Sequence, residues 1–175
     1  MKITAQIIGL LAVATFLLSY QQKKRKNIIL FNTLSRCLYI LQYMLLGAFS
    51  GAVLDVLGAV SSVVAGKKHK GFVKRHAKAV FIAINGVIIL AGVLIAFYNK
   101  RWLDLFPIAG VLLHTSAFWI SDEKIIRRVS LLGSPFWLVY NLFSQAYGSA
   151  IGDLLTMGSI VIAMIRYKNS DVEPS

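Results

Sequence analysis

The chain has 175 residues, 57% of them hydrophobic, and a formal net charge of +12. Soluble globular domains are about 45–50% apolar, so this composition, with a mean hydropathy of +0.69, excludes an ordinary water-soluble enzyme or binding domain. The basic residues lie in short runs between apolar stretches, which argues against nucleic acid as the partner and is typical of the loops of a membrane protein.

A helix that crosses a bilayer needs about 20 predominantly apolar residues. Seven stretches reach or approach that length, and the third is the shortest. They cover residues 3–20, 28–46, 50–66, 79–98, 102–120, 128–146 and 149–166. We therefore predict an all-α polytopic membrane protein with seven transmembrane helices, in a single membrane domain that comprises residues 1–175. The lipid bilayer is its first expected partner.

The first stretch, residues 3–20, is predicted to remain in the mature protein. It lacks the small-residue cleavage site of a signal peptide, and the basic cluster at 23–26 follows the apolar run where cleavage would occur.

The second stretch contains two notable residues, Arg36 and Cys37. Arg36 either faces a cavity or snorkels to the nearby headgroups, and we favour snorkelling because it costs less. A salt bridge with Asp55 would need a long reach, because the two residues are predicted to lie at different depths. Cys37 is the lone cysteine, so it forms no intramolecular disulfide, and we expect it to pack between helices.

Basic residues follow alternate helices. Fifteen of the 19 lie on one side of the predicted membrane: Lys23, Lys24, Arg25, Lys26, Lys67, Lys68, Lys70, Lys74, Arg75, Lys78, Lys124, Arg127, Arg128, Arg166 and Lys168. The positive-inside rule makes this side cytoplasmic, which places the N-terminus outside and the C-terminus inside. The 67–78 run is interpreted first as a topology determinant, and second as a contact for anionic lipid headgroups.

The sequence repeats itself after about a hundred residues. A shift of 98 positions places residues 36–66 on the later half of the chain, with Tyr39 on Trp137 and Asp55 on Asp153. Three helices per copy would insert the second copy upside down unless one more helix separated them. We therefore predict two parallel three-helix bundles, 3–66 and 102–166, joined by a linker helix at 79–98 in a 3+1+3 plan.

The two repeat-related aspartates are candidates for a binding site. Each lies about one helical turn into an apolar span, where a charged group facing lipid costs a few kcal/mol, so both should point inward. They either line a central cavity, where they would bind a hydroxyl, an amine or a proton, or they only complement the positive end of the helix dipole. The sequence leaves both interpretations open.

The sixth predicted helix carries polar and aromatic residues on one face: Ser134, Trp137, Asn141 and Gln145. The matching face of the second helix carries Arg36, Tyr39 and Tyr43. An indole beside an amide suits a sugar-like ligand, because aromatic faces stack on sugars and amides bond hydroxyls. The alternative is hydrogen bonding between packed helices, which we favour for Ser134 and Gln145 but not for Trp137 and Asn141.

Local sequence features resemble those of known families. They are the basic turn after the first helix, L-G-A-F-S-G-A at 46–52 and W-L-V-Y-N at 137–141. Over residues 7–168 the plan resembles the SWEET and PQ-loop superfamily, and the whole chain resembles the bacterial YgjV-type inner-membrane proteins. The superfamily resemblance implies a small-solute carrier.

In SWEET halves an aromatic residue on the second helix and an asparagine on the third bracket the sugar. The corresponding pairs are Tyr39 with Asp55 and Trp137 with Asp153, each sixteen residues apart. An acid therefore replaces the amide, and no proline–glutamine signature follows the first helix of either half. These departures weaken the inference of a sugar substrate and of a proline hinge from that superfamily.

His114, in the fifth predicted helix, is expected to be a packing residue more than a proton relay. Pro135 is expected to kink the sixth helix. No nucleotide fingerprint, nucleophile motif or metal-ligand spacing occurs, so we expect no enzyme activity, metal or cofactor. The preferred hypothesis is an alternating-access carrier with a substrate site of Tyr39, Asp55, Trp137, Asn141 and Asp153, for a sugar-like, cationic or proton-coupled solute. The alternative is a non-transporting membrane scaffold or partner subunit.

Overall fold

The computed structural model describes residues 2–168, apart from the side chains at 123, 163 and 166–168. Within this part, all regular structure is helical. The elements are α1 (Lys2–Tyr20), α2 (Arg25–Leu46), α3 (Phe49–Gly66), the short α4 (Gly71–Arg75), α5 (Ala77–Asn99), the 3₁₀ helix η1 (Trp102–Leu105), α6 (Phe106–Ala117), α7 (Glu123–Phe143) and α8 (Tyr147–Lys168).

Four of the described helices, α1, α2, α3 and α5, are long and apolar enough to cross a membrane. Two shorter apolar segments, Trp102–Ala117 and Tyr147–Ile162, accompany them. The remaining helix, α7, has 21 residues, and its first turns carry Lys124, Arg127 and Arg128. Each predicted apolar stretch overlaps one long helix of the structure, except 102–120, which covers η1 and α6 together.

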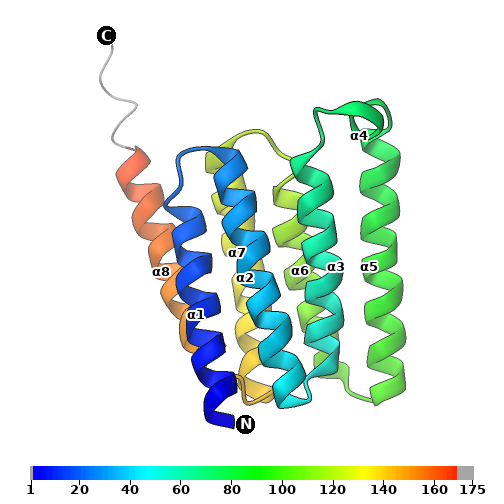
Figure 1. Cartoon of the computed structure of the whole chain (residues 1–175), viewed down its shortest axis with the longest axis vertical. Helices are drawn as coiled ribbons and strands as arrows, with labels where there is room; N and C mark the ends of the chain where they lie inside the picture. The colour runs from blue at the N-terminus through cyan, green and yellow to red at the C-terminus, as the bar shows by residue number, and fades with distance from the viewer. Residues whose placement is uncertain (1, 169–175) are drawn as a thin grey trace.

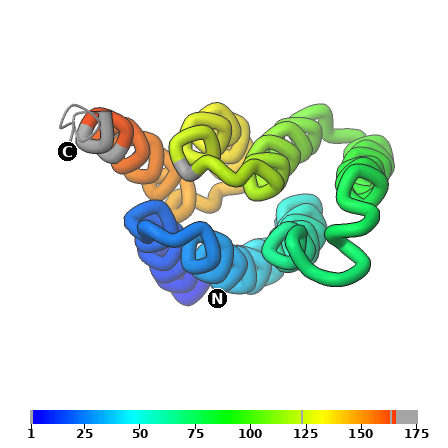
Figure 2. Tube along the Cα trace, turned by 90° about the horizontal axis from the view of Figure 1, so that it is seen from above, coloured from blue at the N-terminus to red at the C-terminus, as the bar shows by residue number. Residues whose placement is uncertain are grey.

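The long helices run up and down in two rows of three (Figures 1 and 2). One row contains α1, α2 and α3, and the other contains α8, α7 and α6. The rows contact each other at both edges, where α1 packs on α8 and α3 packs on α6. Between these edges α2 and α7 face each other. The helix α5 packs against α3 and α6, beside the edge that these two helices form.

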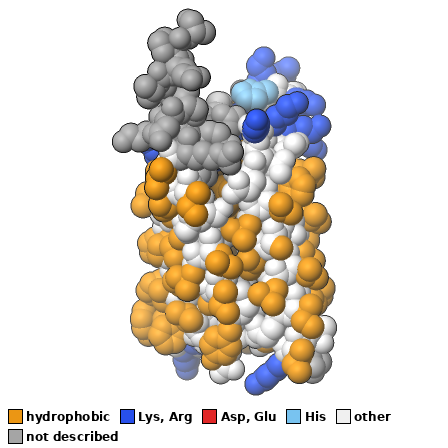
Figure 3. Space-filling view, turned by 90° about the vertical axis from the view of Figure 1, so that its left-hand side faces the viewer, with side chains coloured by type: hydrophobic (Ala, Val, Ile, Leu, Met, Phe, Trp, Pro, Cys, Tyr) orange, Lys and Arg blue, Asp and Glu red, His pale blue; other side chains and the backbone are white. Residues whose placement is uncertain are grey.

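The surface matches a lipid environment. In the side view of Figure 3, hydrophobic side chains cover the middle and Lys and Arg side chains lie at the two ends. The end at the top of Figure 1 holds the connections 21–24, 67–76 and 118–122, and we call it the basic end. The other end is called the opposite end. Cys37 is exposed on α2, which corrects the prediction that it packs between helices.

Two tight turns at the opposite end connect α2 to α3 and α7 to α8. Gly47 ends α2 in the left-handed region, with φ of 70°. Gln145, its counterpart at a shift of 98, also has a positive φ of 57°. Since α7 ends at Phe143, Gln145 lies in this turn and not on the polar face of the helix, which corrects that prediction. Pro135 does lie inside α7, and the helix continues through it.

The segment 118–120 is not part of a helix, although the predicted span extended to 120. The α6 helix ends at Ala117, where its last carbonyl groups accept from the backbone N–H groups of residues 118–120, and side chains from outside α6 bind the carbonyl groups that follow the helix. Arg25 Nη2 donates to the carbonyl of Phe118, and Lys68 Nζ donates to that of Trp119 at 2.6 Å. Cations satisfy the exposed carbonyls at a helix C-terminus and interact favourably with its dipole.

Candidate functional site

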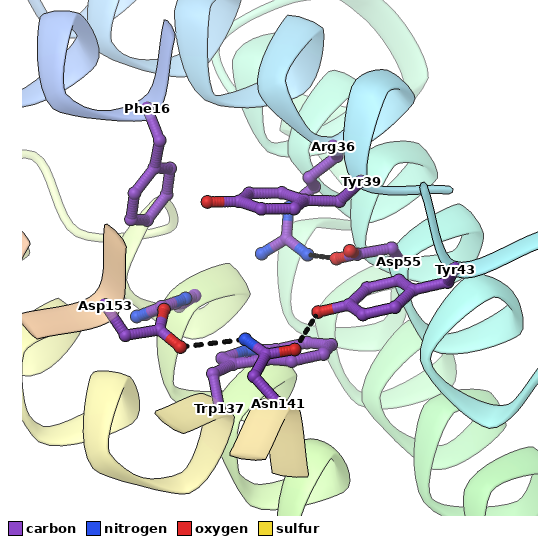
Figure 4. A pocket seen from close by; sticks show the side chains of 9 residues that line it. Phe16, Arg36, Tyr39, Tyr43, Asp55, Trp137, Asn141 and Asp153 are labelled. Atoms are coloured by element: carbon purple, nitrogen blue, oxygen red, sulfur yellow. Dashed lines mark hydrogen bonds and ion pairs between the residues drawn. The ribbon is translucent and has the colours of Figure 1, made fainter. Parts of the chain in front are cut away.

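A small cavity lies at the centre of the molecule, between the two rows. Its volume is about 20 Å³, enough for roughly one water molecule. Side chains from six helices line it: Phe16 of α1, Arg36, Tyr39 and Tyr43 of α2, Asp55 of α3, His114 of α6, Trp137 and Asn141 of α7, and Asp153 of α8. Figure 4 shows these side chains converging from both rows.

All five residues predicted for the substrate site line this one cavity: Tyr39, Asp55, Trp137, Asn141 and Asp153. The structure therefore brings together residues that are up to 114 positions apart in the sequence. Asn141, Asp55 and Asp153 are buried, with exposed fractions of 2%, 3% and 7%. That a solute binds to them stays a prediction.

A hydrogen-bonded chain crosses the cavity from one row to the other. Tyr43 Oη donates to Asn141 Oδ1 at 2.7 Å, and Asn141 Nδ2 donates to Asp153 Oδ2 at 2.8 Å (Figure 4). Tyr43 and Asn141 are themselves repeat counterparts, since they differ by 98 positions. The hydrogen-bond partner of Asp153 in this chain is thus an uncharged amide.

The first aspartate has a charged partner. Arg36 Nη1 donates to Asp55 Oδ1 at 2.5 Å, and Arg36 Nε donates to Asn32 Oδ1 at 3.1 Å. This ion pair corrects the expectation that Arg36 snorkels to the headgroups and lies at another depth. Arg36 comes 11 residues after the start of α2 and Asp55 comes 11 residues before the end of α3. Both therefore lie about 16 Å from the basic end.

A glycine makes room for this pair. A Cβ atom added at Gly58, one turn after Asp55, would lie 2.4 Å from Arg36 Nη1. No real side chain fits at that distance, so the absence of a side chain at Gly58 is required for the guanidinium to reach its position.

Aromatic rings form one wall of the cavity. Tyr39 stacks on Tyr43 with ring centroids 6.2 Å apart, and Tyr43 stacks on Trp137 at 6.1 Å with an interplanar angle of 14°. Gly110 of α6 allows the indole to approach, because a Cβ there would lie 2.6 Å from Trp137 Cδ1. Three aromatic side chains thus lie side by side along the cavity, and aromatic rings bind apolar surfaces as well as cations that reach their faces.

His114 completes the lining on the α6 side. Its Nε2 lies 2.8 Å from the carbonyl oxygen of Ser130, so the imidazole ties α6 to α7. Gly133 provides the space for the ring, since a Cβ there would lie 2.7 Å from His114 Cδ2. The histidine is thus a buried packing residue, as predicted, and at the same time a member of the cavity wall.

Hydrogen bonds join the two rows between the cavity and the opposite end. Tyr140 Oη of α7 accepts from the backbone N–H of Gly51 at 2.8 Å, and Ser149 Oγ of α8 donates to Gln42 Oε1 of α2. A shift of 98 relates Gln42 to Tyr140 and Gly51 to Ser149, so the two contacts are repeat counterparts.

At the basic end the rows are joined by cations and backbone carbonyls. Arg25 donates to the carbonyl groups of Ala65 and Ile120, in addition to that of Phe118. Lys68 also donates to Ser121 Oγ at 2.9 Å. We call this group of contacts the clamp. Burial, with the neighbouring Arg25 charge as a second cause, lowers the pKa of Lys68 from its ordinary value. Bonds between the rows therefore exist on both sides of the cavity.

Four lining residues were not in the predicted set: Phe16, Arg36, Tyr43 and His114. Tyr43 could have been found, because it pairs with Asn141 in the repeat and shares the face of Tyr39. Phe16 carries no comparable signal in the sequence. In the part of the chain that the structure describes, no three His, Cys, Asp or Glu side chains come together as a metal site would require.

Comparison with known proteins gives one finding. The family model described as Imp-YgjV, bacterial inner membrane protein, matches residues 3–171. Neither a curated protein nor a solved structure matches the chain. Because the match extends over nearly the whole sequence, the chain belongs to the Imp-YgjV family of bacterial inner membrane proteins.

Proposed function

We propose that this protein is a small-solute carrier that works by alternating access. In this proposal the two rows are the two repeats, α1–α3 and η1–α8, inserted in parallel, and α5 is the linker of a 3+1+3 plan like that of the SWEET and PQ-loop carriers. The solute binds between the rows, and the rows rock against each other. No catalytic step or cofactor is part of the proposal.

One observation carries this proposal. The cavity lies where the two rows face each other, and three pairs of repeat counterparts line it: Tyr39 with Trp137, Tyr43 with Asn141, and Asp55 with Asp153. Repeat carriers bind their substrates at such an interface, near the middle of the membrane. Buried polar residues at membrane depth are costly, and they are most often retained for function.

The cavity volume implies a closed conformation. Sites for drug-sized ligands have volumes of about 300–1,000 Å³, far above the 20 Å³ found here. Release of the Tyr140 and Gln42 contacts would open the cavity to the opposite end, whereas release of the clamp would open it to the basic end. Alternating access requires that these two events exclude each other.

The distribution of charge supports an orientation. With 15 of 19 basic residues at one end, we propose that the basic end is cytoplasmic, so that the N-terminus lies outside and the C-terminus inside. The loop at 67–78 then lies at the inner headgroups, where its lysines and arginines are proposed to contact anionic lipids.

Cysteine accessibility tests the carrier against the scaffold alternative. In a background with Cys37→Ala, a carrier should react with a water-soluble thiol reagent at Asn141→Cys and Asp153→Cys, because the cavity opens during its cycle. Leu154→Cys is the matched control, since Leu154 neighbours Asp153 but is 56% exposed on the outer surface of α8 and should lie in lipid. Protection of both cavity positions in a folded protein would refute the carrier and favour a scaffold.

A further inference from the structure

The two halves of the cavity differ in charge although they are related by the repeat. In the first half, Asp55 is paired with Arg36 at 2.5 Å. The shift of 98 places Ser134 at the position of Arg36, so the second half has an aspartate but no arginine. Within the described structure, Arg36 is the only lysine or arginine that lines the cavity. Asp153 is left with the neutral amide of Asn141.

From this asymmetry we infer that Asp153 binds a positively charged group of the solute, and that this group is a primary ammonium. This inference rests on the proposed function, because only a carrier would transport the ligand as a solute. In the first half the Arg36 guanidinium is the counter-ion of Asp55. In the second half the cationic group of the solute is the counter-ion of Asp153. A buried carboxylate is costly unless a cation compensates it, so the bound solute stabilises the site by completing a second ion pair.

The surroundings of Asp153 favour an ammonium over a guanidinium. Gly58 leaves the space that the Arg36 guanidinium fills, but its counterpart in the second half is Thr156. The Thr156 hydroxyl is buried and has no hydrogen-bond partner among residues 2–168. The threonine side chain takes up space where the first half has none, which leaves less room for a second guanidinium beside Asp153.

The cavity walls suit the same group. A volume of about 20 Å³ admits a group of the size of one water molecule, which an ammonium resembles. Tyr39, Tyr43 and Trp137 present stacked aromatic rings beside it, and aromatic faces attract cations. The carbon chain of an amine does not fit in this volume, so the whole ligand would bind in a more open conformation of the carrier.

Thermal unfolding of the purified protein in detergent tests the inference with putrescine and its uncharged isostere 1,4-butanediol. A ligand of the native state raises the melting temperature by mass action. Putrescine at about ten times its dissociation constant should raise it by about 3–5 °C, and the diol should not. Tetramethylammonium chloride at equal ionic strength controls for screening and for cations without N–H donors.

Two variants locate the effect. Asp153→Asn should remove the response to putrescine, and Ser134→Arg should remove it as well, because a second resident guanidinium would pair with Asp153. Ser134→Ala is the matched control and should keep the response. Equal stabilisation of wild type and Asp153→Asn, or no stabilisation of a folded wild type, would overturn the inference.

Uptake of radiolabelled putrescine into proteoliposomes separates this inference from the proposed function. Binding that depends on Asp153 without uptake would refute the carrier and leave the ammonium site standing. Uptake of a neutral solute that is unchanged in Asp153→Asn would refute the ammonium site and leave the carrier standing.

Discussion

At the scale of single residues, the buried ion pair of Arg36 with Asp55 is the strongest test of the site's electrostatics. Removal of one partner of a buried pair leaves an uncompensated charge and typically costs about 3–5 kcal/mol, whereas replacing both by apolar groups costs much less. We expect Arg36→Met and Asp55→Leu each to lower the free energy of unfolding by about that amount. The double variant should recover most of the loss.

Chemical unfolding of the four proteins in detergent gives this cycle. Arg101→Met is a suitable control, because Arg101 is exposed at the opposite end and its loss should change stability by less than about 0.5 kcal/mol. Losses that simply add in the double variant would show that the two charges are not coupled.

The sequence identified cavity-lining residues where the same kind of side chain recurs in both copies of the repeat. Tyr39, Asp55, Trp137 and Asp153 were identified by that means, and all of them line the cavity. Arg36 was misplaced because it has no charged counterpart, and because its depth was counted from residue 28 when α2 begins at Arg25. The earlier start moves Arg36 three residues, about 4.5 Å, deeper from the basic end, to the depth of Asp55.

At the scale of the elements, the α7–α8 turn contains an avoidable strain. Gln145 has a φ of 57°, which disfavours any residue with a Cβ, while its counterpart in the other turn is glycine. We expect Gln145→Gly to raise the free energy of unfolding by about 1 kcal/mol, which is roughly 2–4 °C in melting temperature for a chain of this size. The backbone carbonyl that accepts from Gln6 is retained in this variant.

Ser144→Gly is the matched comparison, since Ser144 has an ordinary φ of −87°. Glycine there adds conformational freedom to the unfolded chain and removes the hydroxyl beside Tyr140, so it should lower stability. Equal shifts for the two variants would show that the sign of φ is not the cause.

Helix ends were predicted less well than helices. Apolar length located every long helix, but the segment after Ala117 is held by Arg25 and Lys68, which lie 93 and 51 residues before the carbonyl groups of Phe118 and Trp119 that they bind. A continuous apolar run through Trp119 and Ile120 contains no sign that distant cations will bind its carbonyl groups. Contacts of this kind arise only when the rows are packed together.

At the scale of the whole molecule, the proposed orientation is open to a direct test. A fluorescent protein that matures only in the cytoplasm should be active when fused to the C-terminus. Alkaline phosphatase, which is active only outside, should be active when inserted in the turn between α5 and η1. The reverse pattern would invert the orientation and make the clamp the outer closure.

The ion pair of Arg36 with Asp55 also bears on the origin of the molecule. A symmetric dimer of two identical three-helix chains would have to carry an arginine opposite both aspartates or opposite neither. With two, each carboxylate would be neutralised and no charge would remain for a ligand. With none, two bare carboxylates would face one another in an apolar medium. A single polypeptide escapes this constraint, because its two halves can differ in sequence, and here the first half keeps a fixed counter-ion that the second half lacks.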